Sequence, residues 1–466
     1  MGRLIEGRES VWGGRTFVQR TELSSRRISN GRGLFERGRG GEALSTETSF
    51  WHPYADMGSV RRSEHVMERA DDVWVWDADG NRYLDATAGL WYANVGHGRP
   101  EIRAAVAAQM ERLEACSAFF DLANPPVLEL AEALAERAPM PAKVFFGSGG
   151  SDGIDTAAKL ARRYWWELGE LDRTVLVSRT AAYHGTHGFG TALGGIPSNQ
   201  VGFGPLNETI QVRHDSLEEM EQTFARVGPE RVAAVFLEPV IGAGGVYPPA
   251  PGYIEGVAEL CQRTGVLLVV DAVICAFGRL GTWFGIERWG VKPDMIVFAK
   301  GVTSGYLPLG GVVISERIAE PFWQEPGGPI FRHGSTYAGH PTCCAAALAN
   351  IAVLERDGLL ERGREQEQAL LEALAPLAEH ELVSEVRGGV GTMAAVQLTA
   401  EVCERQPRIA ASLALGARAA GIFVRPGGTA VAVSPPLTAG PEHFELIADG
   451  IDQALCALRE DVLLAV

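Results

Sequence analysis

The sequence predicts an α/β protein with a large domain built on a mostly parallel sheet and a smaller α+β domain. Two observations predict this fold class. Short, nearly all-apolar runs alternate with amphipathic helices between about residues 100 and 335, as in a parallel sheet covered on both faces. Beyond Pro341 this alternation is lost. The 466 residues, 46% of them hydrophobic and 21% charged, are enough for two or three globular domains.

The elements follow from local patterns, taken in chain order. Residues 73–89 alternate around Asp79 and Gly80, which predicts a β-hairpin. Apolar residues at three- and four-residue spacing predict helices at 100–115 and 126–138. The predicted elements of the parallel sheet are strand 143–146, helix 155–168, strand 174–178, strand 232–240, helix 252–264, strand 266–273, strand 293–301 and strand 310–315.

The C-terminal part has a different pattern. It contains predicted helices at 343–356, 362–378 and 442–459, and predicted strands within 386–398 and 422–434. We therefore divide the chain into a flexible N-terminal tail (1–45), an N-terminal part of the small domain (46–100), the large domain (101–335) and a C-terminal part of the small domain (336–466). The tail has nine arginines and five glutamates but no sustained apolar period.

Composition and charge argue against several classes of function. A net charge of -16 disfavours nucleic acid as a partner, and no run of 18 apolar residues predicts a membrane span. No secretory signal is expected at the N-terminus. Seven cysteines without disulfide spacing predict a reducing compartment, the cytoplasm. His184 and His187 have no third ligand at metal spacing, so no metal site is predicted.

Chemistry-bearing residues lie where the predicted strands end. Strand 143–146 leads into a glycine-rich loop with Ser148 and Ser151 that opens a helix, strand 266–270 ends at Asp271, and strand 295–299 ends at Lys300. Open parallel sheets bind ligands at this carboxyl edge. A helix N-terminus suits a phosphate, because it offers unpaired N–H groups and the positive end of a dipole.

Lysine is rare in this chain, so the candidates for amine chemistry are few. The four lysines are Lys143, Lys159, Lys292 and Lys300. A phosphate cradle, the amine of Lys300 and the carboxylate of Asp271 in one crevice suit pyridoxal phosphate. The loop would hold the phosphate, Lys300 would join the aldehyde as a Schiff base, and Asp271 would keep the ring nitrogen protonated. The alternative is an ordinary ion pair between Lys300 and Asp271.

Six motifs, in order, carry a resemblance to a known family. They are GSGGSDGIDTAAKLARRYW, AAYHG, FLEPVIGAGG, VVDAVICAFGRLG, FAKGVTSGYLPLGG and HGSTYAGHPTCCAAAL. From about Phe50 to the C-terminus the chain resembles the class III aminotransferases, of the omega-transaminase or amine:pyruvate kind. The resemblance implies the pyridoxal-phosphate-dependent transferase fold type I and a homodimer with shared active sites, or a tetramer that contains such dimers.

The resemblance also implies roles for individual residues. The cofactor contacts would come from Gly150 and Ser151 at the phosphate, Tyr183 on the ring with His184 in the same motif, Glu238 near the ring hydroxyl, Asp271 at the ring nitrogen, Val273 on the other ring face, Lys300 as covalent link and proton carrier, and Thr336 at the phosphate of the neighbouring subunit. Tyr54, Trp91, Phe119 and Phe120 match aromatic positions of the substrate pocket. Arg425 matches a mobile arginine that pairs with a substrate carboxylate, for which its planar fork is suited.

The chain departs from the family pattern at a few positions. Ala272 replaces an acidic residue and Ala276 a glycine, Ile154 stands where asparagine is frequent, and Ser335 where an aromatic residue is frequent. We expect these changes to affect the local hydrogen bonding of the pocket rather than the groups that hold the cofactor.

The sequence thus predicts a ping-pong transfer of an amino group from a primary amine or ω-amino compound to pyruvate or a similar keto acid. Aminomutase, racemase and decarboxylase reactions use the same cofactor chemistry and remain alternatives. A serine hydrolase is a further alternative, because GxSxG surrounds Ser151 and is followed by Asp271 and by His333 or His340. A family member kept only as a binding scaffold is the non-enzymatic alternative.

Overall fold

The computed structural model describes residues 49–62 and 64–464, so the predicted tail at 1–45 lies outside the described residues. The chain divides into two compact units, Met1–His65 and Val66–Val466. In the first unit, the short helix α1 (Met57–Val60) begins at Asp56, whose carboxylate accepts hydrogen bonds from the backbone N–H groups of Gly58 and Ser59. Such N-caps stabilise the start of a helix.

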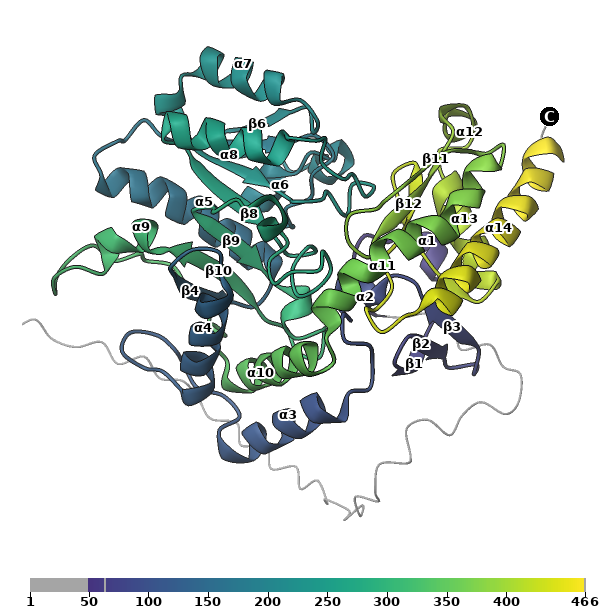
Figure 1. The fold of residues 1–466 in the computed structure, drawn as a ribbon, viewed down its shortest axis with the longest axis horizontal. Coiled ribbons are helices and arrows are strands. Elements are labelled where there is room, and N and C mark those ends of the chain that lie inside the picture. Colours follow the sequence, from purple (N-terminus) through teal and green to yellow (C-terminus); the bar gives the residue numbers. More distant parts are fainter. Residues whose placement is uncertain (1–48, 63, 465–466) are drawn as a thin grey trace, which may run out of the picture. The chain divides into compact units, whose positions relative to one another are not determined.

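A seven-stranded sheet dominates the second unit (Figure 1). Its strands in spatial order are β4 (Ala142–Gly147), β10 (Gly310–Ser315), β9 (Met295–Phe298), β8 (Leu267–Asp271), β7 (Val232–Leu237), β5 (Val175–Arg179) and β6 (Thr209–Val212). All neighbours are parallel except β10, which runs antiparallel to both β4 and β9. The prediction of a mostly parallel sheet is confirmed.

Helices cover both faces of this sheet. Helix α5 (Gly150–Glu167) covers one face, and α7 (Leu217–Val227) and α8 (Tyr253–Thr264) cover the other. Strand β7 shows the consequence, since Val235 and Leu237 belong to the core on one face and Phe236 to the core on the other. Because both faces are buried, the strand is apolar throughout instead of alternating. The other helices of this part are α3 (Pro100–Arg112), α4 (Pro125–Arg137), α6 (Gly188–Leu193), α9 (Glu316–Ala319) and α10 (Pro341–Arg356).

Two four-stranded sheets complete the second unit. The first contains β1 (Met67–Asp71), β2 (Trp74–Asp77), β3 (Arg82–Asp85) and β13 (Ile422–Phe423), and the second contains β11 (Val383–Arg387), β12 (Ala394–Leu398), β15 (Ala430–Val433) and β14 (Arg425–Gly427). The predicted hairpin is confirmed as β2 and β3. Strand β13 pairs with β3, so residues before position 100 and after position 336 share a sheet. The predicted domain boundaries themselves stay a prediction.

The remaining elements are short or C-terminal. They are α2 (Ala88–Trp91), α11 (Leu359–Leu374), α12 (Ala400–Arg405), α13 (Ile409–Ala419), α14 (Pro441–Leu464) and the 3-10 turns η1 (Pro197–Gln200), η2 (Pro229–Arg231), η3 (Ile286–Trp289), η4 (Lys300–Val302), η5 (Glu320–Phe322) and η6 (Ala375–Glu379). Within the described part of the chain, no helix has the length and apolarity needed to cross a membrane.

Candidate active site

Strands β8 and β9 bring Asp271 and Lys300 to one edge of the seven-stranded sheet. The strands are parallel neighbours, with Asp271 opposite Val297 in their register. Lys300 follows the last residue of β9 by two positions and begins the turn η4. The carboxylate and the amine therefore lie at the carboxyl edge of adjacent strands, where the sequence predicts them.

The backbone at Lys300 is strained and braced by a buried amide. Lys300 has a φ of 47°, in the left-handed region that costs a non-glycine residue about 1–3 kcal/mol. Asn350 on α10, fully buried, donates hydrogen bonds to the carbonyl oxygens of Gly301 at 2.8 Å and Val302 at 3.0 Å. The sequence analysis did not identify Asn350. Its one distinguishing feature is that it is a single amide side chain in an otherwise alanine-rich helix.

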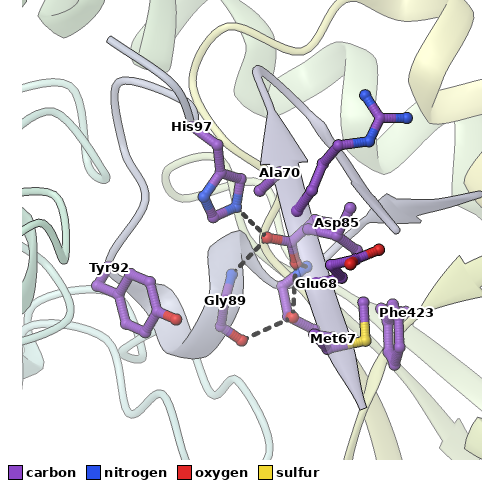
Figure 2. A pocket seen from close by; sticks show the side chains of 11 residues that line it. Met67, Glu68, Ala70, Asp85, Gly89, Tyr92, His97 and Phe423 are labelled. Carbon is purple, nitrogen blue, oxygen red and sulfur yellow. Dashed lines mark hydrogen bonds and ion pairs between the residues drawn. The ribbon is translucent and has the colours of Figure 1, made fainter. Parts of the chain in front are cut away.

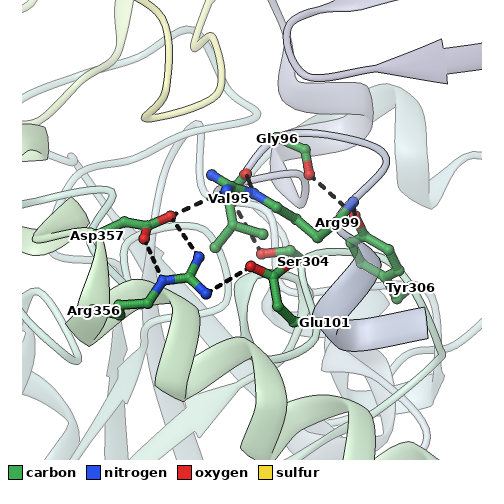
Figure 3. A network of polar contacts seen from close by, with 8 residues as sticks. All are labelled: Val95, Gly96, Arg99, Glu101, Ser304, Tyr306, Arg356 and Asp357. Carbon is green, nitrogen blue, oxygen red and sulfur yellow. Dashed lines mark hydrogen bonds and ion pairs between the residues drawn. The ribbon is translucent and has the colours of Figure 1, made fainter. Parts of the chain in front are cut away.

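The loop that follows Lys300 is tied to the residues just before α3 (Figure 3). The backbone N–H of Val95 donates to Ser304 Oγ at 3.3 Å, and the N–H of Arg99 donates to the Tyr306 hydroxyl at 2.5 Å. Arg99 also pairs with Asp357 at 3.1 Å. The exposed ion pairs around it, such as Arg356 with Glu101, are worth little individually. The hydrogen bonds nevertheless fix the Lys300 loop against the segment that follows Trp91.

Lys300 has an amine of unusual acidity. Burial lowers its pKa from 10.5 to about 8, and the positive charge of Arg425 adds to this effect, while Asp271 and Glu238 oppose it. Lys300 as a whole residue is half-buried. With a pKa near 8, about a tenth of the amine is neutral at pH 7, compared with less than about a thousandth for an ordinary lysine.

Asp271 is held in one orientation by two donors. Its Oδ2 lies 2.8 Å from Nδ1 of His184, and its Oδ1 accepts the backbone N–H of Val273 at 3.1 Å. Because a carboxylate can only accept, Nδ1 is assigned the proton of the imidazole. The other ring nitrogen of His184, Nε2, is buried and has no hydrogen-bond partner among the described residues. The sequence placed His184 in a motif with Tyr183 but did not reveal this contact with Asp271.

Glu238 follows β7 and anchors the loop that carries Tyr183. Its Oε1 accepts the backbone N–H of Tyr183, and its Oε2 accepts that of Gly242, both at 3.0 Å. Burial raises the pKa of Glu238, an effect that His184 opposes and Asp271 reinforces. Tyr183, His184, Glu238 and Asp271 therefore form one connected group.

The N-terminus of α5 is the place where the sequence predicts an anion cradle. Its N-cap is Gly149, so no side chain caps the helix, and a Cβ built on Gly149 would meet nothing within 4 Å. A Cβ on Gly150 would meet the side chain of Val273 at 3.0 Å, which shows how closely these two residues approach. Ser151 Oγ accepts the backbone N–H of Thr186 at 3.1 Å. Open space before an uncapped 18-residue helix suits a phosphate.

These residues fit pyridoxal phosphate. Gly150 and Ser151 could hold its phosphate, Lys300 its aldehyde carbon, and Asp271 its ring nitrogen. The buried Nε2 of His184 has no hydrogen-bond partner among the described residues, so it is available to a bound ligand. Among the described residues, no group of three or more His, Cys, Asp or Glu side chains could hold a metal ion.

Trp91 and Arg425, for which the sequence predicts substrate-binding roles, contact each other. The guanidinium carbon of Arg425, on β14, lies 4.4 Å from the centre of the Trp91 ring, a cation–π contact. Trp91 is buried, and its indole N–H has no partner among the described residues. The positive charge of Arg425 lowers the pKa of Lys300, so Arg425 lies in the electrostatic environment of the amine.

Four residues with predicted roles are exposed in the structure. Phe119 and Phe120 are exposed, Phe120 almost completely at 99%, and Thr336 is exposed in the loop before α10. A Cβ on Gly334 would lie 3.4 Å from the Phe119 ring, so this loop runs beside the phenylalanines. Tyr54 belongs to the other unit, where its side chain is exposed. The roles of these four residues stay predictions.

The structure does not assemble the serine hydrolase triad. Asp271 contacts His184, and Ser151 contacts Thr186. Of the two candidate bases, His333 instead lies 2.8 Å from the Thr156 hydroxyl and 2.9 Å from the Lys159 amine, and the buried Nδ1 of His340 has no hydrogen-bond partner among the described residues. A nucleophilic serine needs a base within hydrogen-bond reach, so this alternative is not supported.

The departures from the family pattern are accommodated without disturbing the site. Ala272, Ala276 and Ile154 are buried in the core. Ser335 places its hydroxyl 3.4 Å from that of Ser148, at the edge of the anion cradle. None of them removes a group that contacts Lys300 or Asp271.

Comparison with known proteins also indicates an aminotransferase. The family model described as aminotransferase class-III matches residues 57–455. A putrescine–pyruvate aminotransferase from Pseudomonas aeruginosa is 35% identical over 418 residues, covering 84% of this chain and 91% of that protein.

Two solved structures are similar as well. A thermostable (S)-enantioselective omega-transaminase from Thermomicrobium roseum shares 39% identity with a TM-score of 0.82, covering 87% of this chain and 96% of that one. An amine transaminase from an uncultivated Pseudomonas species, in its PLP-bound form, shares 37% identity with a TM-score of 0.85, covering 89% of this chain and 100% of that one.

Proposed function

This chain belongs to the class-III aminotransferases, enzymes that use pyridoxal phosphate, and we propose that it transfers an amino group from a primary amine or ω-amino compound to pyruvate or a similar keto acid. The observation that carries the proposal is the contact of Arg425 with the Trp91 ring, together with the effect of the Arg425 charge on Lys300. It combines an apolar ring face with a cation that can bind a carboxylate. The similarity to a putrescine–pyruvate aminotransferase supports it.

Lys300 acts as both anchor and proton carrier in this proposal. Pyridoxal phosphate, when bound, supplies an electron sink for the carbanion that forms at the substrate carbon. The neutral amine of Lys300, favoured by its lowered pKa, accepts the proton from that carbon. The protonated amine then donates the proton again in a later step of the amino-group transfer. Gly150 and Ser151 hold the anionic end of the ligand at the start of α5.

Asp271 provides the negative charge that keeps the ring nitrogen protonated. His184 donates its Nδ1–H to Asp271 and keeps the carboxylate in place. The backbone N–H of Val273 holds the second oxygen. Preorganised hydrogen bonds of this kind avoid reorganisation during the reaction.

Arg425 explains how one pocket can serve two kinds of substrate. An apolar amine needs the face of Trp91, whereas a keto acid needs a cation that can bind its carboxylate in a bidentate manner. Since both use the same pocket, the aldehyde or ketone formed from the amine donor must leave before the keto acid enters, which is a ping-pong order.

We expect Arg425→Ala to raise the KM for pyruvate by roughly 10- to 100-fold, since a charge-assisted hydrogen bond contributes about 1.5–3 kcal/mol. The KM for benzylamine should change less than about threefold. The pKa of Lys300 should rise, because a nearby positive charge is removed, and this should appear in the pH profile of the amine half-reaction. Steady-state kinetics with each substrate varied in turn measure the two KM values and the difference between their changes.

Arg82→Ala is the matched control for this variant. Arg82 also stacks on a tryptophan, with its guanidinium carbon 4.1 Å from the centre of the Trp74 ring, but it lies on the β2–β3 hairpin. This control should leave both KM values unchanged. Equal losses for pyruvate and benzylamine in Arg425→Ala would refute the carboxylate role.

The active form in this proposal is a homodimer, on its own or within a tetramer, in which Thr336 of each chain serves the phosphate site of the other. The exposed rings of Phe119 and Phe120, beside the loop that carries Thr336, support a surface that a second copy covers. Cytoplasmic location is also part of the proposal, and the seven cysteines, all of them unpaired, support it.

Mixed dimers test whether the sites are shared. We expect Thr336→Asp to weaken cofactor binding at least tenfold, because a carboxylate would repel the phosphate. A heterodimer of one Thr336→Asp chain and one Lys300→Ala chain should then contain one site with both native residues. Activity should rise well above that of either homodimer. If each site uses its own Thr336, no native site forms and the mixture stays as inactive as its parents.

A further inference from the structure

Asp85, the last residue of β3, is a buried carboxylate outside the site described above. It is 3% exposed and accepts hydrogen bonds from two directions (Figure 2). Its Oδ1 accepts the backbone N–H of Thr87 at 3.2 Å and the Thr87 hydroxyl at 3.0 Å. Its Oδ2 accepts the backbone N–H of Gly89 at 2.6 Å and lies 2.9 Å from Nε2 of His97. All of its acceptor capacity is thus directed at one turn and one histidine.

The turn held by Asp85 leads directly to Trp91. Ala88, Gly89 and Trp91 have φ values of 45°, 66° and 59°, so the left-handed region is occupied three times within four residues. Such a run is unfavourable for residues with a Cβ and persists only where the surroundings enforce it. The N–H of Trp91 returns to the carbonyl of Thr87 at 2.9 Å, which closes the turn.

Packing does not hold this turn on every side. A cavity of about 450 Å³ borders it, lined among others by Thr87, Gly89 and Tyr92 from the turn and by Met67 and Phe423 from the neighbouring strands. The hydrogen bonds to Asp85 restrain the turn on the cavity side. A change at Asp85 should move the turn rather than be absorbed by close packing.

We propose that Asp85 is a positioning residue for the carboxylate subsite: by holding the Thr87–Trp91 turn, it sets the place of the Trp91 ring and, through it, of Arg425. The inference rests on the proposed function of Arg425. It follows from the chain of contacts that runs from Asp85 to the turn, from the turn to Trp91, and from the Trp91 face to the guanidinium at 4.4 Å. Small displacements of a positioning group have large effects on the binding of an oriented ligand.

Asp77 offers a closely matched control. It ends the adjacent strand β2, is also 3% exposed, and also receives four hydrogen bonds. Their donors are Asp79 N at 3.1 Å, Asn81 N at 2.8 Å, Asn81 Nδ2 at 3.0 Å and Tyr83 OH at 2.7 Å. Asp77 therefore holds the β2–β3 turn as Asp85 holds the next one, but that turn does not carry Trp91.

The test compares Asp85→Asn with Asp77→Asn in the full-length holoenzyme, using pyruvate and propanal as acceptors. The two acceptors share a reactive carbonyl, and only pyruvate has a carboxylate. We expect Asp85→Asn to raise the KM for pyruvate about tenfold and that for propanal less than about twofold. Asp77→Asn should lower the Tm by a similar amount and leave both KM values unchanged. Equal changes for the two acceptors in Asp85→Asn overturn the proposal.

A milder variant and a double variant complete the test. Thr87→Val keeps the shape of the side chain and removes only its hydroxyl. It should raise the KM for pyruvate about threefold and leave that for propanal nearly unchanged, even if Asp85→Asn folds poorly. If Asp85 acts through Arg425, Asp85→Asn combined with Arg425→Ala should have the same KM for pyruvate as Arg425→Ala alone. Fully additive effects overturn the positioning role.

The outcomes separate this inference from the function on which it rests. A raised KM for pyruvate in Arg425→Ala, together with an unchanged KM in Asp85→Asn and Thr87→Val, overturns the role of Asp85 and leaves the proposed function intact. An unchanged KM in Arg425→Ala overturns the carboxylate subsite itself, and the role of Asp85 with it.

Discussion

Lys300→Ala is expected to abolish transamination, with a loss of at least about 10⁴-fold, and to leave the protein colourless after reconstitution with pyridoxal phosphate. The reason is that no other amine is placed to replace it. Of the three other lysines, Lys143 lies on β4, Lys159 is bonded to His333, and Lys292 is exposed before β9. Visible absorbance of the reconstituted protein and turnover with an amine and pyruvate measure the two effects.

The same site can be examined in the wild-type apoprotein by its pH dependence. Only the neutral amine can attack an aldehyde, so covalent capture of pyridoxal phosphate should increase as pH rises. With a pKa of about 8, the rate should rise about fiftyfold between pH 6 and pH 8 and level off above about pH 9. Reduction with borohydride followed by peptide mass spectrometry identifies the lysine that reacted.

Lys159→Ala is the control for Lys300→Ala and should remain yellow and active. A Lys300→Ala protein with full colour and turnover would contradict the assignment. A capture rate that keeps rising through pH 10 would instead show that burial does not lower the pKa of Lys300, while leaving its covalent role in place.

Asp271→Ala is expected to lower kcat by roughly a thousandfold. At an effective dielectric constant near 20, a carboxylate about 4 Å from a cation contributes roughly 4 kcal/mol, which corresponds to about three pKa units of the ring nitrogen. Without Asp271 the ring nitrogen is mostly unprotonated at neutral pH and accepts electrons poorly. Single-turnover kinetics of the amine half-reaction measure the loss without interference from product release.

A half-buried aspartate at the opposite edge of the same sheet provides the control for Asp271. Asp294 precedes β9, accepts the backbone N–H of Leu268 at 2.9 Å and lies 3.2 Å from Arg317. Asp294→Asn should lower the Tm, because a half-buried hydrogen-bonded group is altered, but should leave the half-reaction unchanged. Asp271→Asn is the parallel variant at the site. A half-reaction within tenfold of wild type in both Asp271 variants would show that the ring nitrogen does not depend on this carboxylate.

The central strands could be predicted because burial on both faces makes them apolar throughout. Strand β1 was missed because all five of its residues are exposed and it is held by backbone pairing with β2, which leaves no hydrophobic pattern. Strand β6 was missed because it is a short edge strand, only partly buried. The antiparallel direction of β10 could not be predicted from the sequence either. An apolar run does not indicate the direction of its strand, which depends on the path of the chain in the fold.

The site was predicted to the extent that its groups follow strands. Lys300 and Asp271 could be named because residues after parallel strands gather at one edge. The contact of His184 with Asp271 and the bracing of the Lys300 turn by Asn350 could not, because they join residues 87 and about 50 positions apart. The hydrolase alternative was left open for the same reason, since the order of Ser151, Asp271 and His333 in the chain does not reveal which histidine meets the carboxylate.

The sequence by itself determined which reactive groups exist and in what order the strands present them: one lysine after a buried strand, one aspartate after its neighbour, and a glycine-rich helix start. Only the tertiary structure decided how those groups behave. Burial and the charge of Arg425 set the acidity of Lys300, and the turn held by Asp85 sets the place of Trp91. Desolvation, Coulomb interactions and hydrogen-bond geometry depend on distances in space, and residues far apart in the chain create those distances only when it folds.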